Sequence, residues 1–202
     1  MKREGILYII SAPSGAGKTT LCKEVIDIFP GLRHSVSYTT RQARPGEVHG
    51  RDYFFVPKEE FERMVAAGEF AEWAEVHGNL YGTALKTLDG FRRDGIDVLL
   101  DIDCQGARLL QERFAGGVFI FILPPSFDEL RRRLDFRNSD SAEVIARRIE
   151  NAAAEIREAR WYDYIIVNDV FTRAVEELKS VIIAERCRTE RVLAAVSEKF
   201  EM

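Results

Sequence analysis

Short, continuous apolar runs alternate with longer segments of helical periodicity along most of the chain. The runs show little alternation with polar residues, which is typical of parallel strands covered on both faces, and they lie at 6–10, 96–100, 118–123 and 164–167. Between them, apolar residues recur at helical spacing over 18–29, 106–114, 127–134, 142–160 and 172–186. This strand–helix alternation predicts an α/β fold built on a doubly wound parallel sheet.

Two segments depart from this pattern. Residues 35–83 are rich in aromatic and β-branched residues with glycines between them, so we predict a small strand-rich insertion with one helix near 58–67. Residues 131–160 contain eight arginines and six acidic residues. We therefore expect a single domain, 1–202, whose core comprises 1–34, 84–130 and 161–202.

Composition narrows the classes of protein that fit. The chain has 202 residues and a formal net charge of −4, which suits one domain and excludes an overall positive field for nucleic acid. No apolar run reaches the ~18 residues of a membrane span, and the first run is too short for a signal peptide, so we expect a cytoplasmic protein. Cys22, Cys104 and Cys187 lie far apart, so we expect reduced thiols and no metal-ligand cluster.

The turn between the first strand and the first helix carries a phosphate-binding loop (P-loop) pattern. It reads Ala12-Pro13-Ser14-Gly15-Ala16-Gly17-Lys18-Thr19, with Ala12 where the pattern has glycine. Glycines let backbone N–H groups approach an anion, and the helix N-terminus adds positive potential there. Lys18 can neutralise the β- and γ-phosphates, and the Thr19 hydroxyl can ligate Mg²⁺. We expect this loop and Thr20 to bind ATP; the alternative is a glycine-rich turn with an exposed lysine.

Two acidic residues, Asp101 and Asp103, follow the buried run at 96–100. The carboxyl end of a parallel strand is where ligands bind in open α/β sheets, and in a regular strand both side chains point the same way. We expect Asp101 to hold Mg²⁺ through a water molecule. Asp103 fits either the same site or the N-cap of the helix that follows.

Further motifs resemble those of guanylate kinases, in order along nearly the whole chain. Besides the P-loop they are SYTTRQARPGE (37–47), GRDY (50–53), EW (72–73), GNLYGT (78–83), DIDCQG (101–106) and IVND (166–169). The resemblance implies the reaction ATP + GMP ⇌ ADP + GDP, with dGMP as a further acceptor and Mg²⁺ as cofactor. It also implies a GMP-binding insertion at 35–83 and a helical lid at about 131–160.

The resemblance implies roles for individual residues as well. The GMP phosphate would be held by Arg41, Arg44, Tyr53 and Tyr81. The guanine base would be read by Ser37, Glu72 and Thr83, with Asp103 nearby. Besides Lys18, the catalytic residues would be Arg133, Arg137 and Arg148 from the lid. Asn168 would lie near the adenine of ATP.

The chemistry of these side chains supports the assignments. Paired arginines hold a phosphate in bidentate geometry, and one carboxylate at Glu72 can accept from both the N1–H and the N2 amino group of guanine. AMP would leave that carboxylate unpaired, and sites of this kind reject the wrong ligand by roughly 10⁴–10⁵. Taken alone, Arg41 and Arg44 also fit solvated loop charges, Tyr53 and Tyr81 fit core aromatics, and Glu72 fits the solvent face of a strand.

The arginine-rich segment has an alternative explanation as a salt-bridged helical hairpin. Asp135, Glu143 and Glu150 lie close to its arginines in sequence. As a lid, the segment would bring arginines onto the transferred phosphoryl group and exclude water. Phe136 precedes Arg137 where the family often has glycine.

Two other functions fit parts of the sequence. A P-loop kinase of the same fold that acts on a phosphorylated sugar would not need Ser37, Glu72 and Thr83 together. A catalytically silent, peptide-binding module of the same family can dispense with residues 17–19, which this chain retains. For the kinase we expect ATP and GMP as partners, neither nucleic acid nor membrane, and a monomer or homodimer. Trp73 and Trp161 are expected in the core.

Overall fold

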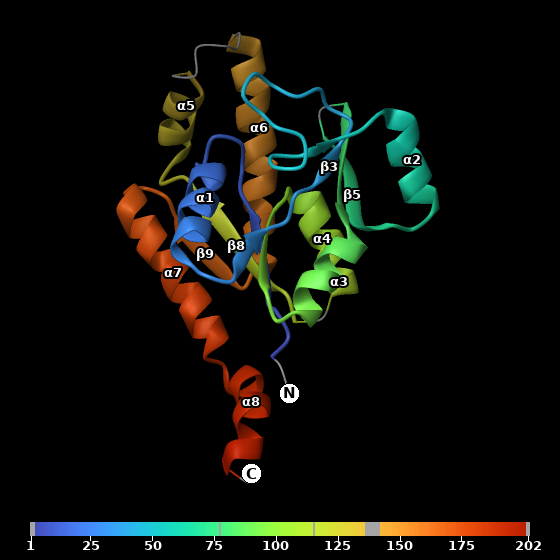
Figure 1. Ribbon diagram of the computed structural model, residues 1–202. Helices are drawn as coiled ribbons and strands as arrows, with labels where there is room; N and C mark the ends of the chain where they lie inside the picture. The colour runs from blue at the N-terminus through green and yellow to red at the C-terminus, as the bar shows by residue number, and fades with distance from the viewer. Residues whose placement is uncertain (1–2, 77, 115, 136–141, 201–202) are drawn as a thin grey trace.

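A five-stranded parallel sheet forms the core of the computed structural model, which describes residues 3–76, 78–114, 116–135 and 142–200 (Figure 1). The strand order is β2-β7-β1-β8-β9, and all neighbours are parallel. The strands are β1 (Leu7–Ser11), β2 (Leu32–His34), β7 (Asp97–Asp101), β8 (Val118–Leu123) and β9 (Tyr164–Val167). The predicted α/β class is confirmed, and the four predicted strands lie within one residue of their expected positions.

Helices cover both faces of this sheet. Tyr8 and Ile10 of β1 pack against α1 (Lys18–Ile28) and α7 (Phe171–Arg186) on one face. Leu7 and Ile9 pack on the other face against α3 (Leu85–Arg93) and α4 (Cys104–Arg113). Every residue of β1 is buried, which explains why its sequence shows no alternation. Each large apolar side chain buried in this way contributes about 1.5–3 kcal/mol.

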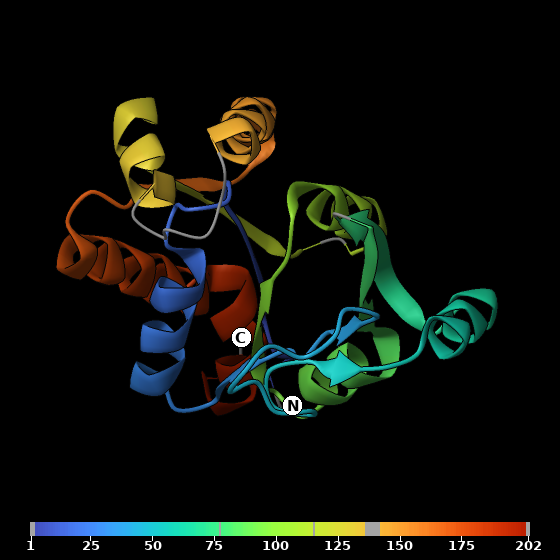
Figure 2. The same cartoon turned by 90° about the horizontal axis from the view of Figure 1, so that it is seen from above.

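The predicted strand-rich segment forms a second sheet with the order β4-β3-β6-β5. Its elements are β3 (Tyr38–Thr39), β4 (Phe54–Phe55), α2 (Lys58–Ala66), β5 (Phe70–Val76) and β6 (Asn79–Ala84). Phe61 and Met64 of α2 pack on Phe70 and give this sheet a small core of its own. Figure 2 shows the second sheet beside the first, with α2 at its outer edge. β6 runs directly into α3, so the two sheets are joined by a rigid element.

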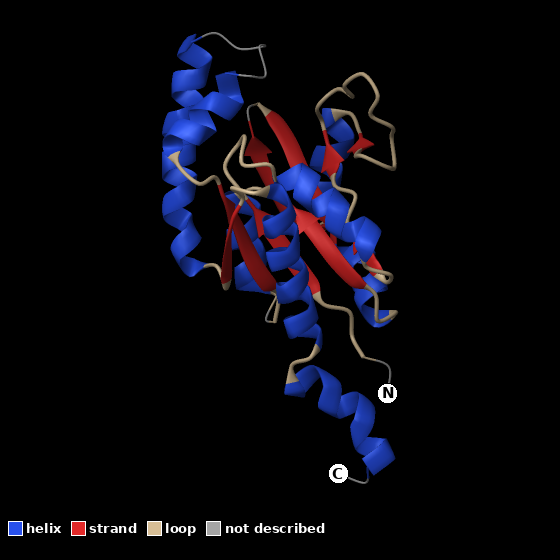
Figure 3. Ribbon diagram, turned by 90° about the vertical axis from the view of Figure 1, so that its left-hand side faces the viewer, coloured by secondary structure: helices blue, strands red, loops and turns tan. Residues whose placement is uncertain are grey.

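The arginine-rich segment folds as two helices, α5 (Phe127–Asp135) and α6 (Ala142–Glu158), followed by a short 3-10 helix (Ala159–Trp161). Leu130 and Leu134 of α5 pack against Ala152 of α6. The expected site residue Arg137 and its neighbour Phe136 lie outside the described residues. The last helix, α8 (Thr189–Phe200), extends away from the sheet beyond the end of α7 (Figure 3).

Three elements and one side chain differ from the sequence predictions. The pattern did not predict β2, α3 or α8. Trp161 packs against the core as expected. The placement of Trp73 in the core was wrong, because its side chain is 42% exposed on β5.

The structure also shows the state of the cysteines and bears on metal clusters and membrane spans. Cys22 and Cys104 are buried free thiols, and Cys187 is an exposed one. Within the described ranges, no three His, Cys, Asp or Glu side chains gather closely enough to hold a metal ion by themselves. Among those same residues, no helix has the length and apolar character needed to cross a bilayer.

Candidate active site

The P-loop follows β1 and ends where α1 begins, at Lys18. Gly15 and Gly17 have φ values of 93° and 89°, in the left-handed region that favours glycine. At Gly17 there is also no space for a side chain, since a Cβ there would lie 2.4 Å from Nδ2 of Asn168. The intact glycines of the motif are therefore required by backbone conformation and by a close approach.

Asn168 connects the end of β9 to the P-loop. Its side chain is buried, and its Nδ2 donates a 2.8 Å hydrogen bond to the carbonyl oxygen of Ala16. The backbone carbonyl of Asn168 accepts a hydrogen bond from the Arg133 guanidinium at 2.9 Å. Arg133 also donates to Glu129, one turn earlier in α5, at 2.8 Å. Asn168 thus fixes both the loop and the arginine-rich helix.

A cavity of about 540 Å³ opens on this side of the loop. It is lined by Gly15, Gly17, Thr20, Arg132, Arg133, Asn168, Asp169 and Phe171. Backbone N–H groups at a helix N-terminus together with two guanidinium groups favour a polyanion here.

A second cavity, of about 270 Å³, lies on the other side of the same loop. Because Gly17 and Thr20 line the first cavity and Lys18 and Thr19 the second, the two flank one P-loop. The rest of the second cavity comes from both sheets and is lined by Ser37, Tyr53, Glu72, Ala74, Val76, Tyr81, Gly82, Asp101, Ile102 and Asp103. The P-loop therefore separates two cavities, and Lys18 lines the second.

Lys18 is held at the end of β7. Its Nζ lies 2.5 Å from Oδ1 of Asp101 and donates to the carbonyl oxygen of Ile102 at 2.7 Å. Burial by itself lowers the pKa of Lys18, but the ion pair and hydrogen bond with Asp101 outweigh it and raise the pKa above its ordinary value. The side chain is therefore a fixed cation in the wall of the second cavity.

Glu72 is a buried carboxylate in the wall of the second cavity. It lies on β5 just after a register shift between Phe70 and Glu72, and it is only 5% exposed. Its Oε1 accepts a 2.5 Å hydrogen bond from the hydroxyl of Thr83, opposite it on β6. Burial raises the pKa of Glu72 to about 7, the Thr83 hydrogen bond lowers it in part, and the charge of Asp103 adds to the rise.

Asp103 takes the N-cap position of α4 and also lines the second cavity. Its carboxylate caps α4 by accepting a 2.8 Å hydrogen bond from the backbone N–H of Gly106. It also lines the second cavity, together with Asp101. Strand β7 ends at Asp101, so residues 102–103 do not continue its pleat. The irregular backbone of these two residues brings the carboxylates of Asp101 and Asp103 to the same cavity.

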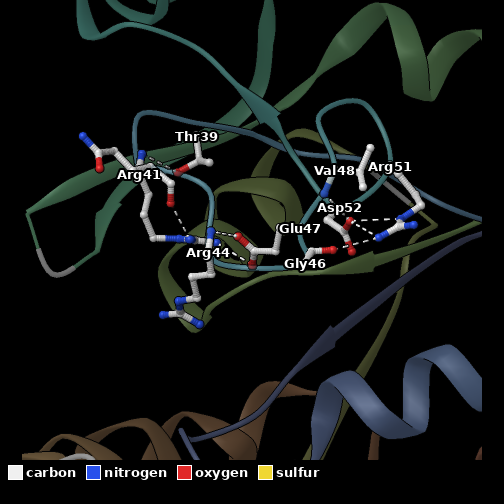
Figure 4. Close-up of polar contacts among 9 residues, drawn as sticks. Thr39, Arg41, Arg44, Gly46, Glu47, Val48, Arg51 and Asp52 are labelled. Carbon is white, nitrogen blue, oxygen red and sulfur yellow. Dashed lines mark hydrogen bonds and ion pairs between the residues drawn. The ribbon is translucent and has the colours of Figure 1, made fainter.

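An arginine-bearing loop borders the second sheet (Figure 4). The Arg41 guanidinium pairs with Glu47 at 2.9 Å and lies 5.4 Å from the ring centre of Tyr53. Glu47 also accepts from the backbone N–H of Arg44 at 2.7 Å, while the Arg44 side chain is exposed. The hydrogen bond from Arg41 is the main reason that the pKa of Glu47 is lowered. The same hydrogen bond with Glu47 raises the pKa of the Arg41 guanidinium, and a hydrogen bond with Tyr81 raises it further.

The site can be compared with known proteins on this basis. The family model for guanylate kinase matches residues 4–185. This chain belongs to the guanylate kinase family.

Relatives and a solved structure agree with this membership over the full length of the chain. The guanylate kinase of Geobacter sulfurreducens is 76% identical, and that of Geobacter metallireducens 73% identical, over all 202 residues and the whole of each relative. The crystal structure of guanylate kinase from Anaplasma phagocytophilum has a TM-score of 0.81 at 35% identity, covering 100% of this chain and 98% of that one.

In this guanylate kinase family member, most of the residues singled out in the sequence come together. The residues expected for GMP that line the second cavity are Ser37, Tyr53, Glu72, Tyr81 and Asp103. Thr83 lies behind Glu72, completely buried. Thr19 and Asp101, the expected metal residues, line the same cavity as Lys18. Arg148 is half-buried on α6.

Two polar residues of the site were not singled out from the sequence. Glu47 organises the loop of Arg41 and Arg44, and Glu129 holds Arg133. Glu47 closes the 37–47 motif, so its acidic side chain three residues after an arginine was a usable signal. Glu129 is visible as the i, i+4 partner of Arg133.

Proposed function

We propose that this member of the guanylate kinase family transfers the γ-phosphoryl group of MgATP to GMP, or to dGMP, and releases ADP and GDP. The observation that carries the proposal is that the P-loop lysine, Lys18, and the buried Glu72 line one cavity. An oxygen of the GMP phosphate attacks the γ-phosphorus. A new P–O bond forms, the bond to the β–γ bridging oxygen breaks, and that oxygen leaves with ADP. A protein nucleophile is not needed.

ATP would occupy the first cavity. Residues 12–20, apart from Pro13, supply backbone N–H groups and Lys18 for its phosphates, and Asn168, which also lines this cavity, would lie near the adenine. When the β- and γ-phosphates arrive, Lys18 gains anionic partners in place of Asp101. This exchange keeps the lysine charged throughout the reaction.

The donor set fits Mg²⁺ held jointly with the nucleotide. Mg²⁺ prefers oxygen ligands and keeps several waters, so one hydroxyl and one nearby carboxylate suffice alongside phosphate oxygens. Thr19 would ligate the ion through its hydroxyl, and Asp101 through a water molecule, since both face the second cavity beside Lys18. When bound, the ion neutralises phosphate charge and polarises the phosphoryl oxygens.

The guanine base of GMP would be recognised in the second cavity. Ionised Glu72 accepts from N1–H and from the N2 amino group, and these donors replace the water that burial has removed from it. The Thr83 hydroxyl fixes the carboxylate through Oε1, and Ser37 faces the same cavity for the O6 acceptor. Asp103 adds a second acceptor nearby.

The phosphate of GMP would be held by Arg41, Arg44, Tyr53 and Tyr81. The stacking of Arg41 near Tyr53 and its pairing with Glu47 support a preorganised guanidinium, while the exposed Arg44 is able to swing onto the phosphate. Hydroxyls of the tyrosines add donors without adding charge.

Catalysis would come from positioning and charge. Arg133, Arg137 and Arg148 belong to a lid that closes over the phosphates, supplies positive groups to the transferred phosphoryl and excludes water. The attachment of Arg133 to the carbonyl of Asn168 supports this, because it links the arginine-rich helix directly to the ATP cavity. A cytoplasmic location, where ATP and GMP are made and used, accompanies the proposal.

An ADP-release assay with a panel of acceptors tests the function. GMP and dGMP should support ADP formation with Mg²⁺, whereas AMP and sugar phosphates should give rates at least ~10³-fold lower, because they cannot pair with Glu72. If a sugar phosphate gave the same rate as GMP, the conclusion that GMP is the specific acceptor would be wrong. No ADP formation with any acceptor would reject the kinase activity altogether.

A further inference from the structure

One helical glycine lies directly against the specificity carboxylate. Gly106 is the third residue of α4, and a Cβ built on it would lie 2.7 Å from Oε2 of Glu72 and 3.2 Å from its Cδ. The same Cβ would lie 3.4 Å from Oδ1 of Asp103. Two carboxylates of the second cavity therefore converge on the place where a side chain is missing.

Backbone conformation does not explain this glycine. Gly106 is helical with no positive φ, so every L-residue could adopt its conformation. Alanine is the better helix former, and a glycine inside a helix normally weakens it. Gly90 in α3 gives the contrast, because a Cβ there would meet no atom within 4 Å.

The geometry points to Gly106 as a specificity-positioning residue for the acceptor base, a role that rests on the proposed function. Its bare α-carbon lets α4 approach β5 closely enough to form the back of the Glu72 site. Gly106 thereby sets how deep the Glu72 carboxylate lies in the cavity wall. It does not touch the reacting atoms.

The carboxylate has little freedom to adjust if a methyl group is added at residue 106. Thr83 holds Oε1 at 2.5 Å on one side, and Glu72 is nearly completely buried. Oε2 must therefore move by several tenths of an ångström, either stretching the Thr83 bond or advancing into the space for guanine. Two hydrogen bonds to one base edge require both carboxylate oxygens in place, and each bond weakens steeply outside ~2.7–3.2 Å.

The fold itself should tolerate the change. The atom that the new methyl group meets most closely is a side-chain oxygen at the wall of the second cavity, not backbone, so it can shift toward the cavity without moving a helix or strand. The N–H of Gly106 that caps α4 through Asp103 is kept in alanine. The effect is therefore expected on acceptor recognition and not on folding.

The experiment compares Gly106→Ala with Gly90→Ala, a helical glycine-to-alanine change without a close neighbour. Steady-state kinetics are measured with GMP, with IMP, which lacks the N2 amino group, and with varied ATP. For Gly106→Ala we expect KM for GMP to rise about tenfold or more, KM for ATP to stay within about twofold, and Tm to stay equal or rise. The preference for GMP over IMP should fall, whereas Gly90→Ala should match the wild type in its kinetics with an equal or higher Tm.

A second background separates positioning from general damage. In Glu72→Ala the methyl group of Gly106→Ala has no carboxylate to displace, so its effect on KM for GMP should disappear. If Gly106→Ala still raised KM for GMP in the Glu72→Ala background, the inference would be overturned. An equal rise in KM for ATP together with a lower Tm would overturn it too. Gly106→Ala with wild-type GMP kinetics would overturn it as well. Failure of the wild type to phosphorylate GMP would instead remove the proposed function and this inference together.

Discussion

Burial of Glu72 makes folding stability depend on pH. Its pKa rises from 4.5 to about 7 in the folded protein, with burial as the main cause. Between these values the folded chain binds a proton that the unfolded chain has released. The contribution of Glu72 to the free energy of unfolding is therefore fully present below about pH 4.5 and is lost as the pH rises through 7. At 1.36 kcal/mol for each pH unit, the ionised form lowers stability by roughly 3 kcal/mol above that range.

Glu72→Gln removes this charge while keeping the shape of the side chain, and its carbonyl oxygen can still accept from Thr83. In the absence of nucleotide, we expect the variant to match the wild type near pH 4.5 and to exceed it by up to roughly 3 kcal/mol at pH 8. For a chain of this size the difference corresponds to roughly 6–12 °C in Tm. The same variant should lose about 10–100-fold in kcat/KM for GMP, because an amide cannot accept from both guanine donors.

The assay is urea or thermal unfolding of both proteins at a series of pH values from 4.5 to 8.5. Glu75→Gln, an exposed glutamate on the same strand, serves as the control and should show no such gain. A stability difference between Glu72→Gln and wild type that stays constant with pH would refute the reasoning. So would a variant that is less stable than the wild type at pH 8.

Three further substitutions test other parts of the structure. Lys18→Ala should lower kcat by about 10²–10³-fold in the ADP-release assay, since it removes a charge that acts on the transferred phosphoryl group. Gly17→Ala combines a φ of 89° with a clash against Asn168, so calorimetric ATP titration should show affinity at least ~10-fold weaker. The buried Asp97 pairs with Arg186 at 2.7 Å, so Asp97→Ala leaves that arginine without its partner. We expect the free energy of unfolding in urea to fall by about 3–5 kcal/mol, whereas Asp94→Ala, at an exposed position, should leave it nearly unchanged.

The core could be predicted because its strands are buried on both faces. Continuous apolar runs such as 118–123 have a single simple explanation, and the strand is found at those residues. α3 was missed since it is short, contains Gly90 and buries only Leu88 completely. β2 has three residues, too few for a pattern to register.

The residues of the site were predictable, but the way that Glu72 reaches it was not. A glutamate between Ala71 and Trp73 is compatible with the solvent-facing side of a half-exposed strand. Phe70, Ala71 and Glu72 are all buried across the register shift in β5, so strict alternation fails there, and Trp73 is exposed against its hydrophobicity. A single irregularity of this kind leaves no periodic signal, because it depends on which residues of β6 pair with β5. Local rules are expected to fail at positions that serve binding, which is the role proposed for Glu72.

The paired cations of the site imply that the acceptor base, and not its phosphate, decides which ligand is used. Lys18 is paired with Asp101, and Arg41 with Glu47, each within 3 Å. An arriving phosphate must replace these carboxylates as the partner of each cation. Its net gain in binding free energy is therefore the difference between the new and the old ion pair, which is small compared with either one. Within the part of the chain that the structure describes, Glu72 hydrogen-bonds to a neutral hydroxyl and forms no ion pair. Donors from a guanine base therefore relieve a buried charge outright, whereas a sugar phosphate brings only the exchange at the two cations.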